Sequence, residues 1–112
     1  MAADAKGQSW AILAASEMGK GVWLKARLKA DKPARLVIWD TNDEYQAAAR
    51  EVATFAELLA AIHAPRFAVR YVPKGKTAKA LRAEFETFCT LVYVAEGATI
   101  VVEELADVTA SS

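Results

Sequence analysis

A lysine behind a loop of small residues is the first group in this sequence that could do chemistry. The loop follows the apolar run 10–14, which is short enough to be a buried strand, and it precedes a segment with helical spacing. Its residues are Ala15, Ser16, Glu17, Met18, Gly19, Lys20 and Gly21. Backbone N–H groups at a helix N-terminus can wrap a phosphate, and Lys20 would add a full positive charge. We therefore treat residues 15–21 as a candidate phosphate-binding loop.

The usual pattern for such a loop is G-x-x-x-x-G-K followed by Ser or Thr. Gly19 and Lys20 match this pattern, whereas Ala14 replaces the first Gly and Gly21 replaces the hydroxyl that binds Mg²⁺. Glu17 counts against the interpretation, because a carboxylate in the loop would repel phosphate unless it points away. A plain strand, turn and helix with a Gly in the turn is the alternative.

A pair of acids, Glu103 and Glu104, follows the apolar run 98–102. An apolar strand that ends in two acids resembles a Walker B element, in which the first acid holds Mg²⁺ and the second positions or deprotonates the attacking water. Glu103 is therefore the candidate metal ligand and Glu104 the candidate catalytic residue. Asp is usual at the first position, so Glu103 is one methylene longer. The alternative is two solvated carboxylates at the end of a strand.

The elements that must position these groups can be predicted from periodicity and capping residues. A helix over 19–30 would place Val22, Trp23, Ala26 and Ala30 on one side. Residues 35–40 predict a strand, and the four consecutive apolar residues 36–39 within it are typical of a buried parallel strand. Residues 67–73 predict another strand, in which Arg70 indicates a sheet edge.

Two further helices are predicted from their N-terminal residues. Thr54 and Glu57 form a capping box at the start of one helix. Thr77 is expected to cap a long helix that continues through residues 89–94, with Gly97 directly after its end. A strand over residues 89–94 is the alternative that we consider less favoured.

Four strands that alternate with helices predict an α/β fold, a three-layer αβα sandwich with a mostly parallel four-stranded sheet. We expect one domain over residues 1–112, with 1–9 and 106–112 as loose ends. In such sheets ligands bind beyond the carboxyl ends of the strands. The polar segments 16–20, 40–44 and 103–104 all follow predicted strands, so they should converge there.

Composition excludes several classes of protein. Fourteen basic and fourteen acidic residues cancel, so nucleic acid could be bound only through a local patch. The single Cys89 excludes an internal disulfide and a cysteine-based zinc site, and it suits a reducing compartment. No apolar run approaches the roughly 20 residues of a membrane span, and the N-terminus does not read as a signal peptide. We expect a cytoplasmic protein without a membrane partner.

Three blocks of the chain, 15–21, 37–45 and 100–104, together resemble the HerA–FtsK class of P-loop ATPases. Within that class they are similar to zonula occludens toxin-like and phage or prophage ATPases. The resemblance implies a P-loop NTPase-like fold that binds ATP with Mg²⁺, and homo-oligomeric rings that translocate or package DNA.

The chain departs from that class at Ala14 and Gly21 and in its length. The family continues past Walker B with another strand, which carries a polar sensor residue, and often has an arginine finger, whereas this sequence stops eight residues after Glu104. It is either a truncated piece of a larger ATPase or a small protein that kept the nucleotide-binding half. Unpaired sheet edges would favour self-association. A non-hydrolysing module that binds a protein partner or regulates it is the alternative function.

Three other features have simpler interpretations. His63 is expected to be a surface or cap residue, since no second His or Cys is near it in the sequence. Trp10, Trp23 and Trp39 are expected to be core or interface anchors. The GKT segment 75–77 is interpreted as a basic turn before a helix, or as part of a small phosphate-contacting patch with Lys79 and Arg82.

Overall fold

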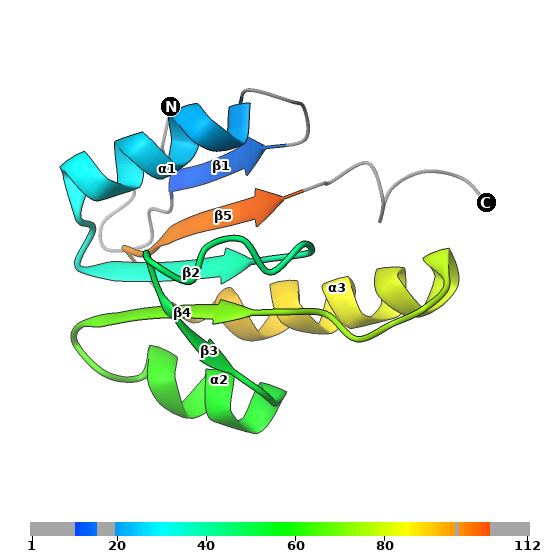
Figure 1. The fold of residues 1–112 in the computed structure, drawn as a ribbon. Helices are drawn as coiled ribbons and strands as arrows, with labels where there is room; N and C mark the ends of the chain where they lie inside the picture. The colour runs from blue at the N-terminus through cyan, green and yellow to red at the C-terminus, as the bar shows by residue number, and fades with distance from the viewer. Residues whose placement is uncertain (1–10, 16–19, 96, 104–112) are drawn as a thin grey trace.

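The computed structural model describes residues 11–15, 20–95 and 97–103, which form one parallel sheet flanked by helices (Figure 1). The strands are β1 (Ala11–Ala15), β2 (Arg35–Trp39), β3 (Arg50–Val52), β4 (Phe67–Tyr71) and β5 (Thr99–Glu103). The helices are α1 (Lys20–Asp31), α2 (Phe55–Ile62) and α3 (Ala78–Val92). The predicted α/β class and the parallel sheet are confirmed.

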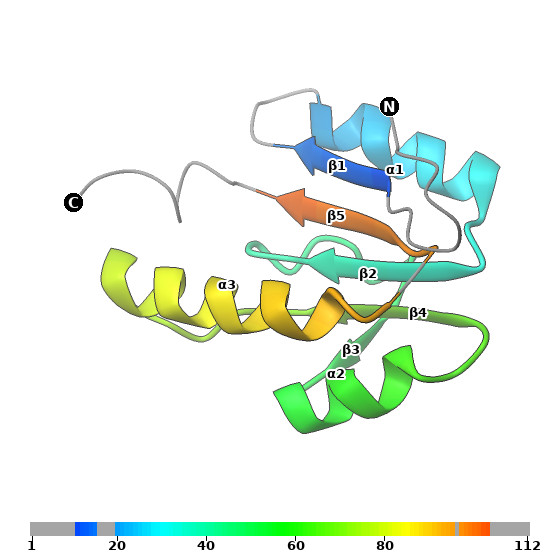
Figure 2. The same ribbon diagram turned by 180° about the vertical axis from the view of Figure 1, so that it is seen from behind.

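The strand order in the sheet is β1-β5-β2-β4-β3, and every pair of neighbours is parallel. Helix α1 covers one face, and α2 and α3 cover the other, as the two opposite views show (Figures 1 and 2). This arrangement is compatible with a three-layer, Rossmann-like sandwich. Among the described residues, no helix is long and apolar enough to cross a membrane.

Alternating side chains of the strands divide the core into two parts. On the α2/α3 face, Trp39 is fully buried, and its ring centroid lies 5.0 Å from that of Phe85 and 5.1 Å from that of Phe88. On the α1 face, the residues whose burial is described form a second apolar cluster: Leu24, Leu28, Leu36, Ile38, Tyr45, Ala49 and Val101. Trp39 is therefore the core anchor that the sequence predicts.

The predicted caps are present. Thr54 Oγ1 accepts a hydrogen bond from Glu57 N at 3.1 Å, and Glu57 Oε1 accepts one from Ala53 N at 2.7 Å. Thr77 Oγ1 likewise accepts from Ala80 N at 3.0 Å and begins α3. Helix α3 continues to Val92, which confirms helix rather than strand at the start of the ambiguous segment 89–94.

Four expectations were wrong. Strand β3 was missed, so the sheet has a fifth, three-residue strand beside β4. Arg70 does not mark a sheet edge, because β4 lies between β2 and β3 and Arg70 is only 7% exposed. Trp23 is not a core anchor, because it is 58% exposed and α1 buries Leu24 and Leu28 instead; its role as an interface anchor stays a prediction. Gly97 has φ +76° but lies four residues beyond the α3 cap Tyr93, in the turn before β5.

Candidate functional site

The carboxyl edge of the sheet brings together the ends of β1, β5 and β2. Strand β1 pairs with β5 so that Ala15 lies opposite Glu103, and α1 begins at Lys20 on the same side of the molecule (Figure 1). The hydroxyl of Thr41, just after β2, donates a hydrogen bond to the Glu103 carbonyl at 3.0 Å. Ala15 and Lys20, which flank the undescribed part of the loop, and Glu103, the first of the two acids, therefore lie at the same edge of the sheet.

The structure describes some of the candidate site residues and leaves others outside the described part of the chain. Ala15 ends β1, Lys20 and Gly21 begin α1, and Glu103 ends β5. The remaining candidates, Ser16, Glu17, Met18, Gly19 and Glu104, lie outside the described residues, as does Trp10. The structure thus bears on the strand and helix that flank the loop and on the first of the two acids.

Of the two candidate acids Glu103 and Glu104, only Glu103 lies among the residues that the structure describes. Glu103 is 5% exposed at the end of β5, where it pairs in register with Ala15 of β1. The buried phenol of Tyr45 lies close enough to be affected by it. Burial raises the pKa of Tyr45 above its ordinary value, and the charges of Glu103, Asp40 and Glu44 raise it further. Tyr45 therefore keeps its proton, and its hydroxyl has no hydrogen-bond partner among the described residues.

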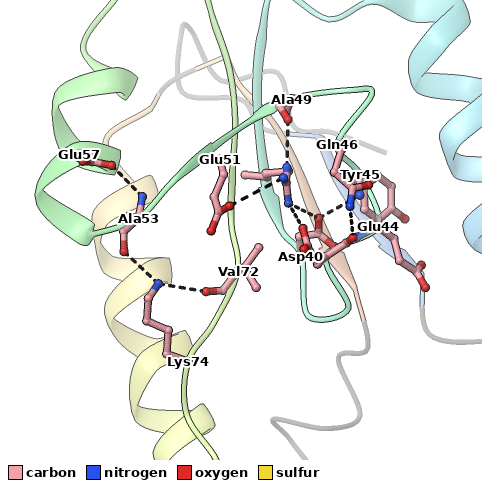
Figure 3. A network of polar contacts seen from close by, with 12 residues as sticks. Asp40, Glu44, Tyr45, Gln46, Ala49, Glu51, Ala53, Glu57, Val72 and Lys74 are labelled. Atoms are coloured by element: carbon pink, nitrogen blue, oxygen red, sulfur yellow. Dashed lines mark hydrogen bonds and ion pairs between the residues drawn. The ribbon is translucent and has the colours of Figure 1, made fainter.

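Asp40, which the sequence places beside the candidate site, has a structural role (Figure 3). Its Oδ1 accepts a hydrogen bond from Glu44 N at 2.9 Å, and its Oδ2 accepts from Tyr45 N at 3.0 Å and from Arg70 Nη1 at 3.2 Å. Both oxygens are therefore occupied in shaping the loop after β2. Asp40 is a loop anchor rather than a ligand for a metal or a phosphate.

Arg70 completes this anchor from β4. Its Nε donates to the carbonyl of Ala49 at 3.0 Å, and its Nη1 also binds Asp43. Burial alone would lower the pKa of Arg70, but the bonds and charges of Asp43 and Asp40 more than offset this, so the pKa is raised. The buried Arg70 thus binds the segment 40–49 at both ends, at Asp40 and at Ala49, and holds it over the α1 face.

A second polar cluster orders the turn between β4 and α3. The Tyr71 hydroxyl donates to Glu84, whose carboxylate also accepts from Lys74 N and Gly75 N at 2.9 Å each. A Cβ at Gly75 would lie 2.9 Å from Leu81 N, so only glycine fits this close approach. The GKT segment is therefore a basic turn and helix start, as predicted.

His63 is also structural. It is the C-terminal cap of α2, and its Nδ1 lies 2.7 Å from the Leu59 carbonyl oxygen. Within the part of the chain that the structure describes, no group of three or more His, Cys, Asp or Glu side chains could hold a metal. A metal at the carboxyl edge would consequently need ligands besides the described side chains, such as phosphate oxygens and water.

No protein-family model, curated protein or solved structure matches this chain. The geometry of the carboxyl edge is therefore the basis for a functional proposal.

Sequence reasoning missed the Asp40–Arg70 anchor. The sequence does carry a sign of it, because a charge inside an otherwise apolar strand must find a buried partner if the strand is internal. Arg70 pairs in register with Ile38, two residues before Asp40, so the partner is the acid at the end of the neighbouring strand. The sequence does not give the strand order, so several other acids could equally have been the partner of Arg70.

Proposed function

We propose that this chain binds a nucleoside triphosphate, with ATP and Mg²⁺ as the expected pair, at the carboxyl edge between β1, α1 and β5. The observation that carries the proposal is the register of β1 against β5, in which Ala15 lies opposite Glu103. The candidate phosphate-binding loop begins beside a buried carboxylate, which is the juxtaposition that a Mg²⁺–phosphate complex requires.

The residues present fit this ligand in part. Backbone N–H groups of residues 16–21 and the Lys20 charge would hold the phosphates, while Glu103 would help hold Mg²⁺. Bound Mg²⁺ would neutralise charge on the phosphate oxygens. Tyr45 supports the proposal independently, since its protonated and unpartnered hydroxyl near Glu103 can donate to an oxygen of a ligand or of water.

Thermal and chemical unfolding with and without MgATP tests the proposal. At a nucleotide concentration 100 times the dissociation constant, the free energy of unfolding should rise by about 2.7 kcal/mol. Lys20→Ala should abolish the rise, whereas Lys79→Ala, which removes an exposed lysine on α3, should preserve it. Glu103→Gln should leave binding of ATP but remove its dependence on Mg²⁺.

Two results would count against nucleotide binding. One is the absence of any stabilisation at millimolar MgATP, and the other is equal stabilisation of the wild type and Lys20→Ala. If nucleotide binds, hydrolysis can be measured next, with Glu104→Gln as the variant expected to bind ATP without turnover. The ring formation and DNA movement that the resemblance implies would depend on that result.

A non-hydrolysing interaction module is the second candidate, and the exposure of Trp23 favours it. Its side chain lies in the first turn of α1, where it is 58% exposed beside Arg27. Large exposed aromatic side chains are enriched in protein interfaces. This candidate expects no effect of MgATP in either the wild type or Lys20→Ala, so the same experiment separates the two functions.

A further inference from the structure

A cavity of about 610 Å³ lies on the α1 face and extends from Tyr45, near the proposed nucleotide site, to Arg66 before β4. It is enclosed by α1 on one side, the segment 44–48 on another and the beginnings of β2 and β4 beneath. Its apolar walls include Leu28, Leu36, Tyr45, Ala48 and Ala68. Cavities that bind small organic molecules typically measure about 300–1,000 Å³ and have mainly apolar walls.

The topology explains why the cavity exists. Parallel sheets usually carry helices on both faces, but the connection from β2 to β3 contains no helix. The segment 40–49, which Arg70 anchors, takes its place over the α1 face. Leu36 and Ala68 are paired in register two residues before Ile38 and Arg70, and they form the part of the sheet that lines the cavity.

The rim of the cavity is strongly cationic, although the chain as a whole is neutral. It carries Lys25, Lys29, Lys32 and Arg66, against the single acid Glu44. Lys25 Nζ lies 3.8 Å from Glu44 Oε1, so the positive charge of Lys25 is partly balanced. Among the described residues, the side chains of the other three cations take part in no ion pair or hydrogen bond.

These three cations come from different segments and lie at one end of the cavity. Lys29 is in the last turn of α1, Lys32 follows that helix with φ +44°, and Arg66 directly precedes β4. The end of α1 and the start of β4 both lie at the amino edge of the sheet, opposite the edge at which α1 begins (Figure 1). An apolar chamber with three unpaired cations at one end is complementary to a molecule that has an apolar body and one anionic group.

We propose that this cavity binds an anionic amphiphile with a single aliphatic chain. The chain lies over Leu28, Leu36 and Ala68, and the anionic group faces Lys29, Lys32 and Arg66. A carboxylate and a phosphate monoester share this chemistry, so the headgroup is decided by experiment. The site does not depend on the proposed nucleotide site, and neither result decides the other.

Binding can be measured by titrating ¹⁵N-labelled full-length protein with four probes below their aggregation limits. Decanoate and decyl phosphate carry both the chain and the charge, 1-decanol carries only the chain, and inorganic phosphate carries only the charge. The two anionic amphiphiles should shift amide signals around residues 28–36 and 44–48. The amphiphile that binds more tightly identifies the headgroup. Both 1-decanol and inorganic phosphate should bind at least about tenfold more weakly.

Charge variants with matched controls locate the headgroup. Lys29→Gln with Arg66→Gln should weaken binding of the better amphiphile roughly tenfold, since two exposed charge contacts are removed. Lys76→Gln with Lys79→Gln changes the net charge equally on exposed positions of the α3 side and should leave binding unchanged. Ala68→Leu narrows the cavity and should weaken both the amphiphiles and 1-decanol.

The proposal is overturned if none of the probes shifts these signals at millimolar concentration. It is also overturned if 1-decanol binds as tightly as decanoate, or if the two double variants weaken binding equally. Because all four charges lie on exposed side chains, the double variants should fold, and their unfolding transitions provide the check.

Discussion

On the α2/α3 face of the sheet, large aromatic side chains close the core, whereas on the α1 face one helix, one loop and a buried arginine do so. Trp39, Tyr71, Phe85 and Phe88 pack against one another on the first face, with ring centroids 5.0–6.4 Å apart. The second face carries an ion-pair anchor and a cavity.

The difference shows where this small domain can accommodate ligands. On the α2/α3 face the described aromatic rings pack directly against one another, as is usual in close-packed protein interiors. A face whose cover is a loop held by directional polar contacts keeps space beside the loop. Both proposed sites lie on or beside the second face, one at the carboxyl edge and one over the beginnings of β2 and β4.

The largest effect that separates the two faces is expected from Arg70→Met. Removal of the cation leaves Asp40 fully buried and without its charge partner, which should lower the free energy of unfolding by about 3–5 kcal/mol. Urea unfolding measures this change. Arg50→Met, an exposed arginine on neighbouring β3, is the matched control and should stay within about 0.5 kcal/mol of the wild type.

A double variant sharpens this test. Asp40→Asn combined with Arg70→Met should recover part of the loss, because no unpaired charge remains in the core. If Arg70→Met alone matched the Arg50→Met control, the ion pairs would not be what holds the segment 40–49.

An intermediate effect on the free energy of unfolding is expected from a Tyr→Phe substitution, made once on each face. Tyr71→Phe removes a hydroxyl that donates to the charged Glu84, and should lower the free energy of unfolding by about 1.5–3 kcal/mol. Tyr45→Phe removes a hydroxyl without a partner among the described residues, and should leave stability unchanged or raise it by up to about 1 kcal/mol. A loss at Tyr45 as large as that at Tyr71 would reveal a partner for the Tyr45 hydroxyl.

The smallest effect, counted per tyrosine and per pH unit, is a dependence of stability on high pH to which both faces contribute. Burial raises the pKa of Tyr45 and of Tyr71 above the ordinary value of 10.0, with further contributions from nearby carboxylates. Below pH 10 both the native and the unfolded states keep these protons. Above it the unfolded state releases protons that the native state retains, so stability should fall as pH rises, by about 1.4 kcal/mol per pH unit for each tyrosine.

Urea unfolding between pH 8 and pH 11.5 measures this slope. Each Tyr→Phe substitution should remove its own share of it, and the double variant should show the shallowest decline. Equal slopes in the wild type and the double variant would mean that other groups cause the loss.

Much of the fold could be predicted because its signals are local. The apolar runs of β1, β2, β4 and β5 and the capping residues Thr54 and Thr77 are legible in short windows of sequence. Strand β3 was not legible, because Arg50 and Glu51 leave Val52 as its only apolar residue. Its place in the sheet comes from pairing with β4, which is a tertiary effect.

The candidate site was predictable only in outline. The rule that ligands bind at the carboxyl ends of parallel strands brings the loop 15–21 and Glu103 to the same edge. It does not say that β1 and β5 are neighbours, since that depends on the path of α3 across the sheet. The cavity was not predictable either. It lies where a helix would otherwise cover the sheet, and the sequence does not show that the β2–β3 connection contains no helix.

The position of β5 between β1 and β2 has a consequence for how the chain is made. The described strands leave the ribosome in numerical order, yet β1 has β5 as its neighbour in the sheet and no contact in register with β2. During synthesis β1 must therefore wait for β5 before it can pair in the sheet. The proposed nucleotide site, which needs both β1 and β5, can form only when translation has passed Glu103.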